Sequence, residues 1–524
     1  MKIERLLLGL FASFLMVGCS QNDDLPNGGE ETKEQKSYVA VNICSPKALG
    51  SRATEAEDFA DADGTEALVK NAHFFFFNDN GQAVTIKEGK NYVTKTITTN
   101  PDNDNNNNTE SMTEEVLVLE KPDVYPTRMV VVLNWNYDGA SLNLNDVQNN
   151  LAEQSISESD AINQTTGFIM SSSVYYDDGI INYATITSEN FGANETEARN
   201  NHVDAYVERL AVKVKAGLKT TDNVNYDSEI EAFTTGVVYK DAQTNTETPI
   251  YAKILGWQIN TTNPSSYLIK HLENNWDETI TNRPFEGWNE NDKYRSYWGI
   301  SSIPASYTNK AFEYSDITEG FNSIAYCLEN TTTTTTKAVF KAEIGTKENG
   351  TFVPLELWQW YGKYFLNPED MTSDVVKKIN AEVDKAGENT IDVTADQIEL
   401  VYNNENETSY QIHFKLKNGV DNPTIGSTTL GAIVEATDYA KNWADGKTYY
   451  FTSIKHLNGE PAVIRNHAYE LLVTKVEGLG TPVNDNTQPE IPEPVDPGDT
   501  ETYIAAQINV LSWRLVDNEV VLGK

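Results

Sequence analysis

Apolar and polar residues alternate in many short runs along this chain, the pattern of β-strands with one buried face. Residues 38–43 show it clearly, with Val39, Val41 and Ile43 on one side. Further predicted strands are 92–98, 115–119 and 207–214, and the continuous apolar runs 73–77 and 128–135 predict strands buried on both faces. Strands therefore dominate the first part of the chain.

A helical period stands out at one place. Val375, Ile379 and Val383 recur every four residues after Thr372-Ser373, and Gly387 is expected to end that helix. A second run of predicted strands extends from about residue 230 to 478 without alternation of strands and helices. This order favours an all-β protein built of β-sandwiches, with one sandwich over 53–216 and another over 217–480.

The C-terminal end carries an apolar segment behind a tether. Residues 481–502 are rich in proline and predict an extended linker, of which twenty residues would reach roughly 60 Å. Residues 503–524 follow and begin with a strand-like apolar run. Because such a strand is unstable alone in water, it is either an aggregation hazard or a strand that joins a sheet elsewhere.

The first and last predicted strands resemble each other. Tyr38-Val39-Ala40-Val41-Asn42-Ile43 matches Tyr503-Ile504-Ala505-Ala506-Gln507-Ile508 in character at each position. The two segments could fill the same position in a sheet, although alternating strands also look alike by chance. In that case Ile504, Ala506, Ile508 and Val510 would face the core, and Leu511 and Trp513 would lie on the opposite face.

The N-terminus has the form of an export signal. Lys2 and Arg5 precede thirteen uncharged residues, Leu6–Gly18, which are too few to span a bilayer. Small residues then lead to Cys19, as in the lipobox of a bacterial lipoprotein. Residues 1–19 are therefore expected to be a signal peptide with Cys19 lipidated; the alternative is an ordinary signal peptide that happens to contain a cysteine.

Arg52-Ala53 lies among small residues in a predicted loop, the setting of a protease site. Cleavage there would free residues 20–52, a propeptide that contains the first strand. The emptied groove could then accept the C-terminal strand of another molecule, a head-to-tail contact that does not close and so grows a filament. The alternative is that Arg52 is an ordinary surface residue.

The charge excludes several classes of partner. Asp and Glu number 78 against 40 Lys and Arg, a net charge of −38. Binding to nucleic acid or to anionic lipid needs clustered positive charge, so neither is expected, and a membrane is expected only through the lipid of the precursor.

Catalytic and cofactor motifs are not evident. The sequence has no HExxH, GxSxG, P-loop, GxGxxG or CxxC pattern, and we expect no enzyme activity and no cofactor. His467 is interpreted as a structural hydrogen-bonding residue and Cys327 as a buried small hydrophobe.

Two clusters of residues could form ligand sites, although each has a more common structural interpretation. Asp58, Asp61, Asp63 and Glu66 could hold calcium, but a solvated acidic segment is the more common meaning. The aromatic run Leu357–Tyr361, with Tyr364, could stack sugars, but is more often core. A surface lipoprotein that binds glycans without polymerising is therefore the alternative function, and a secreted hydrolase is a third.

Several short motifs together resemble the Bacteroidales fimbrillins, subunits of the type V pilus, and most closely the shaft subunit of the short fimbria of Porphyromonas. The resemblance covers nearly the whole chain. Its marks, in order, are the Cys19 lipobox, Arg52-Ala53, 167–171, 207–214, 325–330, 463–470, 478–482 and the 503–516 segment.

The resemblance implies a fold and a route of export, maturation and assembly. It implies two transthyretin-like β-sandwich domains, export as an outer-membrane lipoprotein, cleavage by an arginine-specific protease, and polymerisation at the cell surface by donor-strand exchange. Its implied partners are further copies of the chain, anchor and tip fimbrial proteins, and surface receptors, in support of adhesion and biofilm.

Overall fold

The structure is a computed structural model of the whole chain. It describes residues 36–45, 66, 68–97, 110–120, 124–153, 167–176, 179–241, 244–272, 289–290, 293–295, 313–331, 334–387, 390–402, 411–456, 461–483, 503–511 and 517–518. All of these belong to one compact unit, Lys36–Lys524.

Strands dominate the described residues. The helices are α1 (Leu144–Asn149), α3 (Glu195–Asn200), α4 (Pro368–Lys385) and α5 (Leu430–Glu435), with the 3₁₀ turns η2 (Ser188–Asn190), η5 (Tyr314–Asp316), η6 (Ala395–Gln397) and η7 (Ala444–Gly446). The strands of the first half are β1 (Lys36–Ser45), β2 (Asn71–Phe77), β3 (Tyr92–Thr96), β4 (Glu110–Glu120), β5 (Arg128–Leu133), β6 (Leu151–Glu153), β7 (Met170–Ser172), β8 (Tyr175–Tyr176), β9 (Ile180–Ile181), β10 (Ala184–Thr185), β11 (Phe191–Gly192), β12 (Val203–Arg209), β13 (Ala211–Leu218), β14 (Tyr226–Asp227), β15 (Ala232–Lys240), β16 (Glu247–Asn260) and β17 (Ser265–Tyr267). Those of the second half are β18 (Asn289–Glu290), β19 (Lys293–Arg295), β20 (Ala325–Leu328), β21 (Lys337–Glu348), β22 (Thr351–Pro354), β23 (Leu357–Trp360), β24 (Lys363–Phe365), β25 (Ile398–Val401), β26 (His413–Leu416), β27 (Thr424–Ile425), β28 (Thr428–Thr429), β29 (Lys441–Trp443), β30 (Lys447–Ser453), β31 (Ala468–Glu477), β32 (Thr481–Pro482), β33 (Tyr503–Leu511) and β34 (Asp517–Asn518).

Three larger sheets organise the described strands. The first, of nine strands, has the order β11-β1-β12-β7-β5-β2-β3, with β4 paired to β1 and β10 to β5. The second is β20-β13-β31-β33-β34, and the third is β14-β15-β16-β21-β30-β32 with β22 paired to β21. The sequence predicted an all-β protein, and the described residues are mostly β, with several sheets.

The first sheet closes over its own core. Val39 on β1 and Leu117 on β4 share a buried cluster with Phe74 on β2 and Val131 on β5, although all four strands belong to one hydrogen-bonded sheet. Phe75 and Phe77 point the other way, into a separate cluster. The run predicted to be buried on both faces is therefore confirmed in β2.

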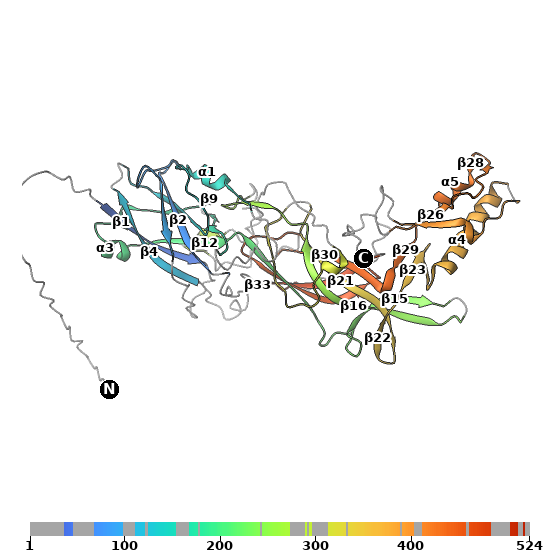
Figure 1. Cartoon of the computed structure of the whole chain (residues 1–524). Coiled ribbons are helices and arrows are strands. Elements are labelled where there is room, and N and C mark those ends of the chain that lie inside the picture. The colour runs from blue at the N-terminus through green and yellow to red at the C-terminus, as the bar shows by residue number, and fades with distance from the viewer. Residues whose placement is uncertain are drawn as a thin grey trace, which may run out of the picture. The chain divides into compact units, whose positions relative to one another are not determined.

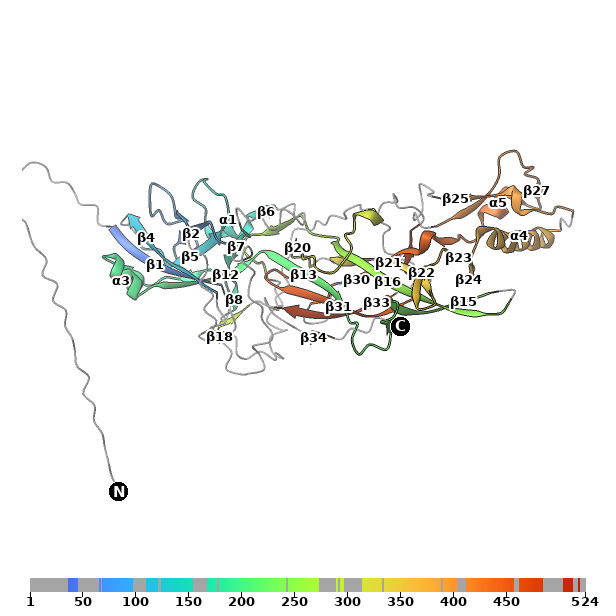
Figure 2. The same ribbon diagram turned by 60° about the horizontal axis from the view of Figure 1, so that its bottom comes forward.

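A second core lies between the second and third sheets. Val212 on β13 and Leu471 on β31 pack there against Phe233 on β15 and Phe340 on β21. β31 and β33 pair along this region, and Figure 2 shows them with β16, β21 and β30 nearby. Alternation along these strands is what places one face of each in the core.

A smaller mixed region interrupts this part of the chain between β22 and β30. Helix α4 packs with β23, β26 and α5 around its own core, to which Val375, Ile379 and Val383 contribute, as their four-residue spacing predicted. The helix begins earlier than expected from Thr372-Ser373. Asn367 caps it by accepting a hydrogen bond from the Asp370 amide (2.8 Å), and proline suits the first turn.

The strand predicted over 207–214 is two strands. Its alternation is continuous, but β12 ends at Arg209 and β13 begins at Ala211. β12 pairs with β1 and β7 in the first sheet, whereas β13 pairs with β20 and β31 in the second. Alternation reports the buried side of each residue and contains no information on the pairing partner, so the change of sheet at Leu210 was not visible.

The helices of the described residues include none that is both long enough and apolar enough to cross a membrane.

Candidate functional site: the first and last strands

β1 occupies an interior position in the first sheet. It pairs antiparallel with β4 over nearly its whole length, from Lys36 opposite Glu120 to Ser45 opposite Glu110. On its other edge it pairs antiparallel with β11 and parallel with β12. Figures 1 and 2 both place it beside β4 and α3. Removal of β1 would therefore expose unpaired backbone groups on two sides, a cost that another strand could remove.

The space that β1 fills, here named the β1 slot, is lined by apolar side chains. On β4, Leu117 and Leu119 have no exposed surface, and on β12 Val203, Ala205 and Val207 are at most 4% exposed. Val39 and Val41 fill the slot and are themselves fully buried, within the same core cluster. Ile43 lies on β1 opposite Ala205 in register. The predicted displaced strand is thus a core strand of the sheet.

The other face of β1, which carries Ala40 rather than Val39 and Val41, is also covered. Ala40 is fully buried, and helix α3 contacts β1 and β4. Ala198 of that helix is buried as well. A side chain larger than alanine at the Ala40 position would meet this packed layer.

The chain is anchored again after β1 at Glu66. The Glu66 carboxylate pairs with the Lys213 ammonium (2.6 Å) and accepts a hydrogen bond from the Tyr326 hydroxyl. Its backbone oxygen accepts from the Arg209 guanidinium (2.9 Å). All of these residues are at most 5% exposed. Arg52 and Ala53 fall between β1 and this anchor, outside the described residues.

β33 lies in a different sheet from β1. It pairs antiparallel with β31 from Tyr503 opposite Glu477 to Leu511 opposite Ala468, with a register shift near Val473. Its other edge pairs with β34 only at Ile508 and Asn509. The predicted donor residues Ile504, Ala506, Ile508 and Val510 are therefore all in a strand of the chain's own second sheet, between β31 and the two-residue strand β34.

Some predicted site residues lie outside the described residues. They are Cys19, Arg52, Ala53, Asp58, Asp61, Asp63 and Trp513. Glu66 is described and, as above, is held by an ion pair. No group of three or more His, Cys, Asp or Glu side chains that could hold a metal occurs in the described part of the chain.

Four of the short motifs that the sequence singled out meet in a buried polar network. Glu329 and Arg465 form an ion pair with no exposed surface on either side chain. The Arg465 guanidinium also donates to the Leu268 backbone oxygen (3.1 Å), and the Ser171 hydroxyl donates to that same oxygen. Ser171 belongs to β7 of the first sheet, so the network connects that sheet to the residues before β31. We call Ser171, Leu268, Glu329, Arg465 and Asn466 the junction network.

Further hydrogen bonds that involve the backbone of the same motifs complete the junction network. The Asn466 carboxamide oxygen accepts from the Arg209 amide (3.2 Å), and the Lys213 amide donates to the His467 carbonyl (3.0 Å). Asn330 and Val463 exchange backbone hydrogen bonds of 2.8 and 3.0 Å. These motifs are far apart in sequence, and their spacing alone did not indicate that they touch.

Electrostatics favour an ionised Glu329. Burial by itself raises the pKa of this carboxyl, but the Arg465 guanidinium and the Ser266 hydroxyl stabilise the charged form, and the resulting pKa lies below its ordinary value. The carboxylate accepts from Ser266 (2.9 Å) and from Arg465 Nε (3.0 Å). Such a pair stabilises the fold only while both partners are charged.

The structural readings of His467 and Cys327 are confirmed. His467 is fully buried and its Nδ1 lies 2.8 Å from the Arg465 carbonyl oxygen. Cys327 lies in β20, is 1% exposed, and belongs to the core between the second and third sheets.

The aromatic run 357–361 is divided by the pleat of β23. Trp358 and Trp360 are at most 4% exposed and pack into the core around α4. Gln359 points to the other face, opposite Tyr364 on β24 and Lys441 on β29. Core packing, the more common reading, is thus confirmed for the two tryptophans.

Comparison with known protein families gives one match. Residues 441–519 match the model of the C-terminal region of fimbrillin, described as the major fimbrial subunit protein type IV. The matched region includes β31, with Arg465 just before it, and β33. No curated protein matches the chain.

Solved structures of fimbrial proteins align with most of the chain at low similarity. A fimbrilin of Porphyromonas gingivalis has 14% identity and a TM-score of 0.36, with 91% of this chain and 99% of that chain covered. The tip fimbrial protein Mfa3 of the same organism has 10% identity and a TM-score of 0.30, with 90% and 99% covered. Its fimbrial anchor protein Mfa2 has 8% identity and a TM-score of 0.26, with 92% and 99% covered.

Proposed function

The C-terminal region of this chain belongs to the fimbrillin family, and from that premise we propose that the protein is a shaft subunit of a fimbrium that polymerises by donor-strand exchange. As a fimbrial protein it is structural rather than enzymatic and belongs to the cell surface. The proposal extends to export as a lipoprotein through Cys19, maturation by cleavage after Arg52, and a pair of transthyretin-like sandwiches. Its partners would be copies of itself and anchor and tip proteins.

The observation that carries the proposal is the interior position of β1. A strand paired on both edges and buried on both faces is normally indispensable to its sheet, yet here it precedes a candidate cleavage site. Glu66 is held by Lys213, Tyr326 and Arg209. Cleavage after Arg52 would therefore leave the new N-terminal end anchored, while β1 would be held only by noncovalent contacts.

The C-terminal strand is a suitable replacement. β33 has one full-length neighbour, β31, and on its other side only the two-residue strand β34. In the β1 slot of another molecule it would have β4 on one edge and β12 and β11 on the other, so it would form more ladder hydrogen bonds than it gives up. Each apolar side chain that it buries there would add about 1.5–3 kcal/mol. The difference between a position paired mainly on one side and one paired along both sides would drive the exchange.

The test is cleavage of residues 20–524 with an arginine-specific protease. We expect filaments by negative-stain microscopy and a heat-labile ladder on a gel run without boiling, only after cleavage at Arg52. The uncleavable Arg52→Gln variant should stay monomeric. Ile508→Asp should be cleaved normally and form no filaments, because a carboxylate cannot be buried unpaired in the slot.

Two results would contradict the proposal. One is cleavage at Arg52 that yields stable monomers with β33 still protected from proteolysis. The other is intact filaments from the Ile508→Asp chain.

A further inference from the structure

The start of β1 lies at the end of the first sheet that points away from its junction with the second sheet. β1 runs parallel to β12, with Val41 opposite Val203, and β12 leads into β13 at that junction. β4 runs antiparallel to β1 and ends at Glu120, opposite Lys36. The chain that follows β4 therefore continues at this end, which we call the free end of the first sheet.

This free end carries two exposed apolar side chains. Val124 and Tyr125 are 60% and 44% exposed. The Tyr125 ring packs on that of Phe191 in β11, with the ring centroids 4.7 Å apart, and the Thr127 amide nearby donates to the Phe77 carbonyl (2.9 Å). We call Val124 and Tyr125 the knob. An exposed aromatic side chain that is already held in place is typical of the residues that anchor protein interfaces.

The start of β33 lies at the far end of the second sheet. β31 runs parallel to β13 from the junction outwards, and Tyr503 of β33 pairs with Glu477, the last residue of β31. The described chain continues as far as Val483, whose amide donates to the Lys447 carbonyl (3.1 Å). Residues 484–502 then connect this end of the molecule to the donor strand.

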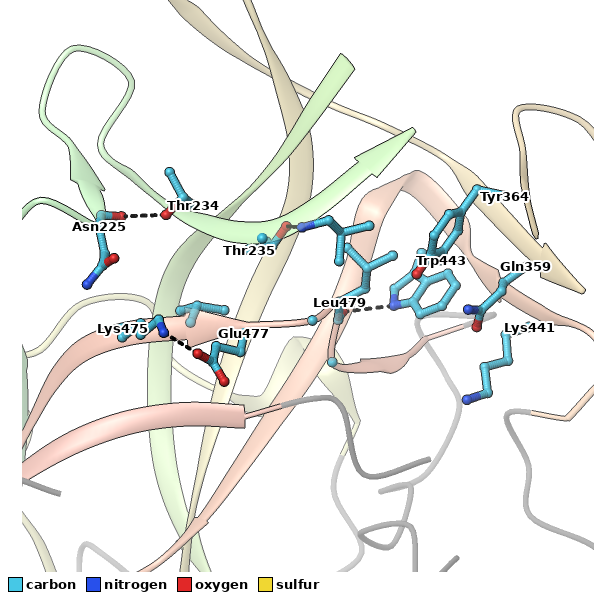
Figure 3. A pocket seen from close by; sticks show the side chains of 15 residues that line it. Asn225, Thr234, Thr235, Gln359, Tyr364, Lys441, Trp443, Lys475, Glu477 and Leu479 are labelled. Carbon is cyan, nitrogen blue, oxygen red and sulfur yellow. Dashed lines mark hydrogen bonds and ion pairs between the residues drawn. The ribbon is translucent and has the colours of Figure 1, made fainter. Parts of the chain in front are cut away.

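A cavity of about 470 Å³ lies at the same far end. One wall includes Gln359 of β23, and the other is formed by β15 and residues 475–480, which include the end of β31 (Figure 3). The pairing of β15 with β16 shifts between Thr234 and Val238, and a Cβ on Gly236 within this bulge would meet nothing within 4 Å. The cavity therefore has open space beside this glycine, and its volume is within the range that binds ligands.

Strand exchange would bring these two ends together. A donor strand aligned with Tyr503 at the Tyr38 position runs in the direction of β1, so the residues before it leave the acceptor at its free end, near the knob. Residues 484–502 then join the acceptor's knob to the donor's cavity, with a reach of roughly 60 Å. A tether of this kind keeps two surfaces at an effective concentration in the millimolar range, so a contact of modest affinity is enough to hold them.

We propose that, in the filament, Val124 and Tyr125 of each subunit pack into the cavity of the subunit that donates its strand. This inference rests on the proposed strand exchange and adds a second contact between the same two copies. Neither residue of the knob is charged, which suits an interface between copies that each have a net charge of −38. The contact converts a joint that only a tether connects into a fixed one.

The first test is chemical cross-linking of filaments assembled from cleaved subunits. A subunit that starts at Ala53 contains one cysteine, Cys327, which is buried. In a chain with Tyr125→Cys and Gln359→Cys, a short bis-maleimide should join neighbouring subunits and give a ladder that survives boiling. Thr351→Cys in place of Gln359→Cys, at an exposed position of β22 outside the cavity, is the control and should boil to monomers.

The second test is filament stiffness. Tyr125→Ser should still form filaments, because β33 and the apolar residues of the β1 slot are unchanged, but these filaments should be several-fold more flexible in electron micrographs. Tyr402→Ser removes a tyrosine of similar exposure, 42%, that does not line the cavity, and should leave the stiffness unchanged.

Two results would overturn the proposal. One is a treated Tyr125→Cys and Gln359→Cys filament that boils to monomers, and the other is a Tyr125→Ser filament as stiff as the wild type. Absence of filaments from the cleaved wild-type chain would contradict strand exchange itself, and this inference with it. Failure of the second contact alone is therefore distinguishable from failure of the proposed function.

Discussion

At the scale of single residues, the most consequential feature is the ion pair of Glu329 and Arg465. Both side chains are fully buried, and the guanidinium also binds the Leu268 and Tyr267 carbonyl oxygens, at 3.1 and 2.7 Å. Ser171 from the first sheet contacts the same Leu268 oxygen. The pair therefore connects β7 of the first sheet to the residues before β31 through the Leu268 carbonyl oxygen.

We expect Arg465→Met to lower the free energy of unfolding by about 3–5 kcal/mol, because it leaves a buried carboxylate without its partner. The double variant with Glu329→Met should be less destabilised than the sum of the two single variants. Arg199→Ala, which breaks the exposed pair with Glu195 (2.7 Å), is the control and should cost well under about 1 kcal/mol. Urea unfolding measures all four. Additive losses would show that the pair does not act as a unit.

The depressed pKa of Glu329 predicts that part of the free energy of unfolding is lost in acid. Its folded pKa lies below the unfolded value of about 4.3, so the stabilisation is complete above that pH and is lost as the pH falls through the folded pKa. The unfolding free energy of the wild-type chain should therefore drop below about pH 4.3 more steeply than that of Glu329→Gln. Parallel pH profiles of the two proteins would contradict this account.

At the scale of elements, the proposed strand exchange depends on the alternation of β1 and β33, and the similarity of the two strands defines one alignment between them. With Tyr503 at the Tyr38 position, Ala505 falls on Ala40 and Ala506 on Val41. Ala40 lies on the face covered by α3, whereas Val41 fills the slot. The same substitution at neighbouring donor positions should thus have opposite effects.

We expect Ala506→Val to stabilise filaments, because it restores the two methyl groups of Val41. The additional buried apolar surface should contribute about 1–2 kcal/mol. Ala505→Val should weaken them, since overpacking under α3 costs about 1–3 kcal/mol. The temperature at which the gel ladder dissociates measures both. The reverse order would indicate a register shifted by one residue, which turns every side chain to the other face.

At the scale of the whole molecule, each subunit would need both an empty β1 slot and a released β33. The structure has both strands in the same chain, β1 between β4 and β12 and β33 beside β31. They lie in different sheets, so one chain can offer its last strand while it receives another.

A chain that ends at residue 502 should cap filaments, because after cleavage it has a slot but no donor strand. Added as about a tenth of the subunits, it should reduce the mean filament length several-fold, in keeping with head-to-tail growth that stops at each incomplete unit. The Ile508→Asp chain, which keeps its full length, should cap in the same way. Unchanged filament length in electron micrographs would indicate that subunits join by another contact.

The sequence by itself determined the local and patterned features of this protein. Alternation predicted β1, β3 and β4, continuous apolar runs predicted β2 and β5, and the four-residue spacing of Val375, Ile379 and Val383 predicted α4. The fimbrillin resemblance rested on short motifs, and the match over 441–519 supports it at the C-terminal end. These features are local because hydrophobic periodicity depends only on which side of one element is buried.

Only the tertiary structure decided what depends on pairing between distant segments. It showed that the continuous alternation of 207–214 changes sheet at Leu210, and that motifs near residues 171, 329 and 465 share one buried network. It also showed that, within the run Leu357–Tyr361, the two tryptophans are core residues and Gln359 lines a cavity. Periodicity gives each residue a face but no partner, and partners are chosen by the packing of the whole chain.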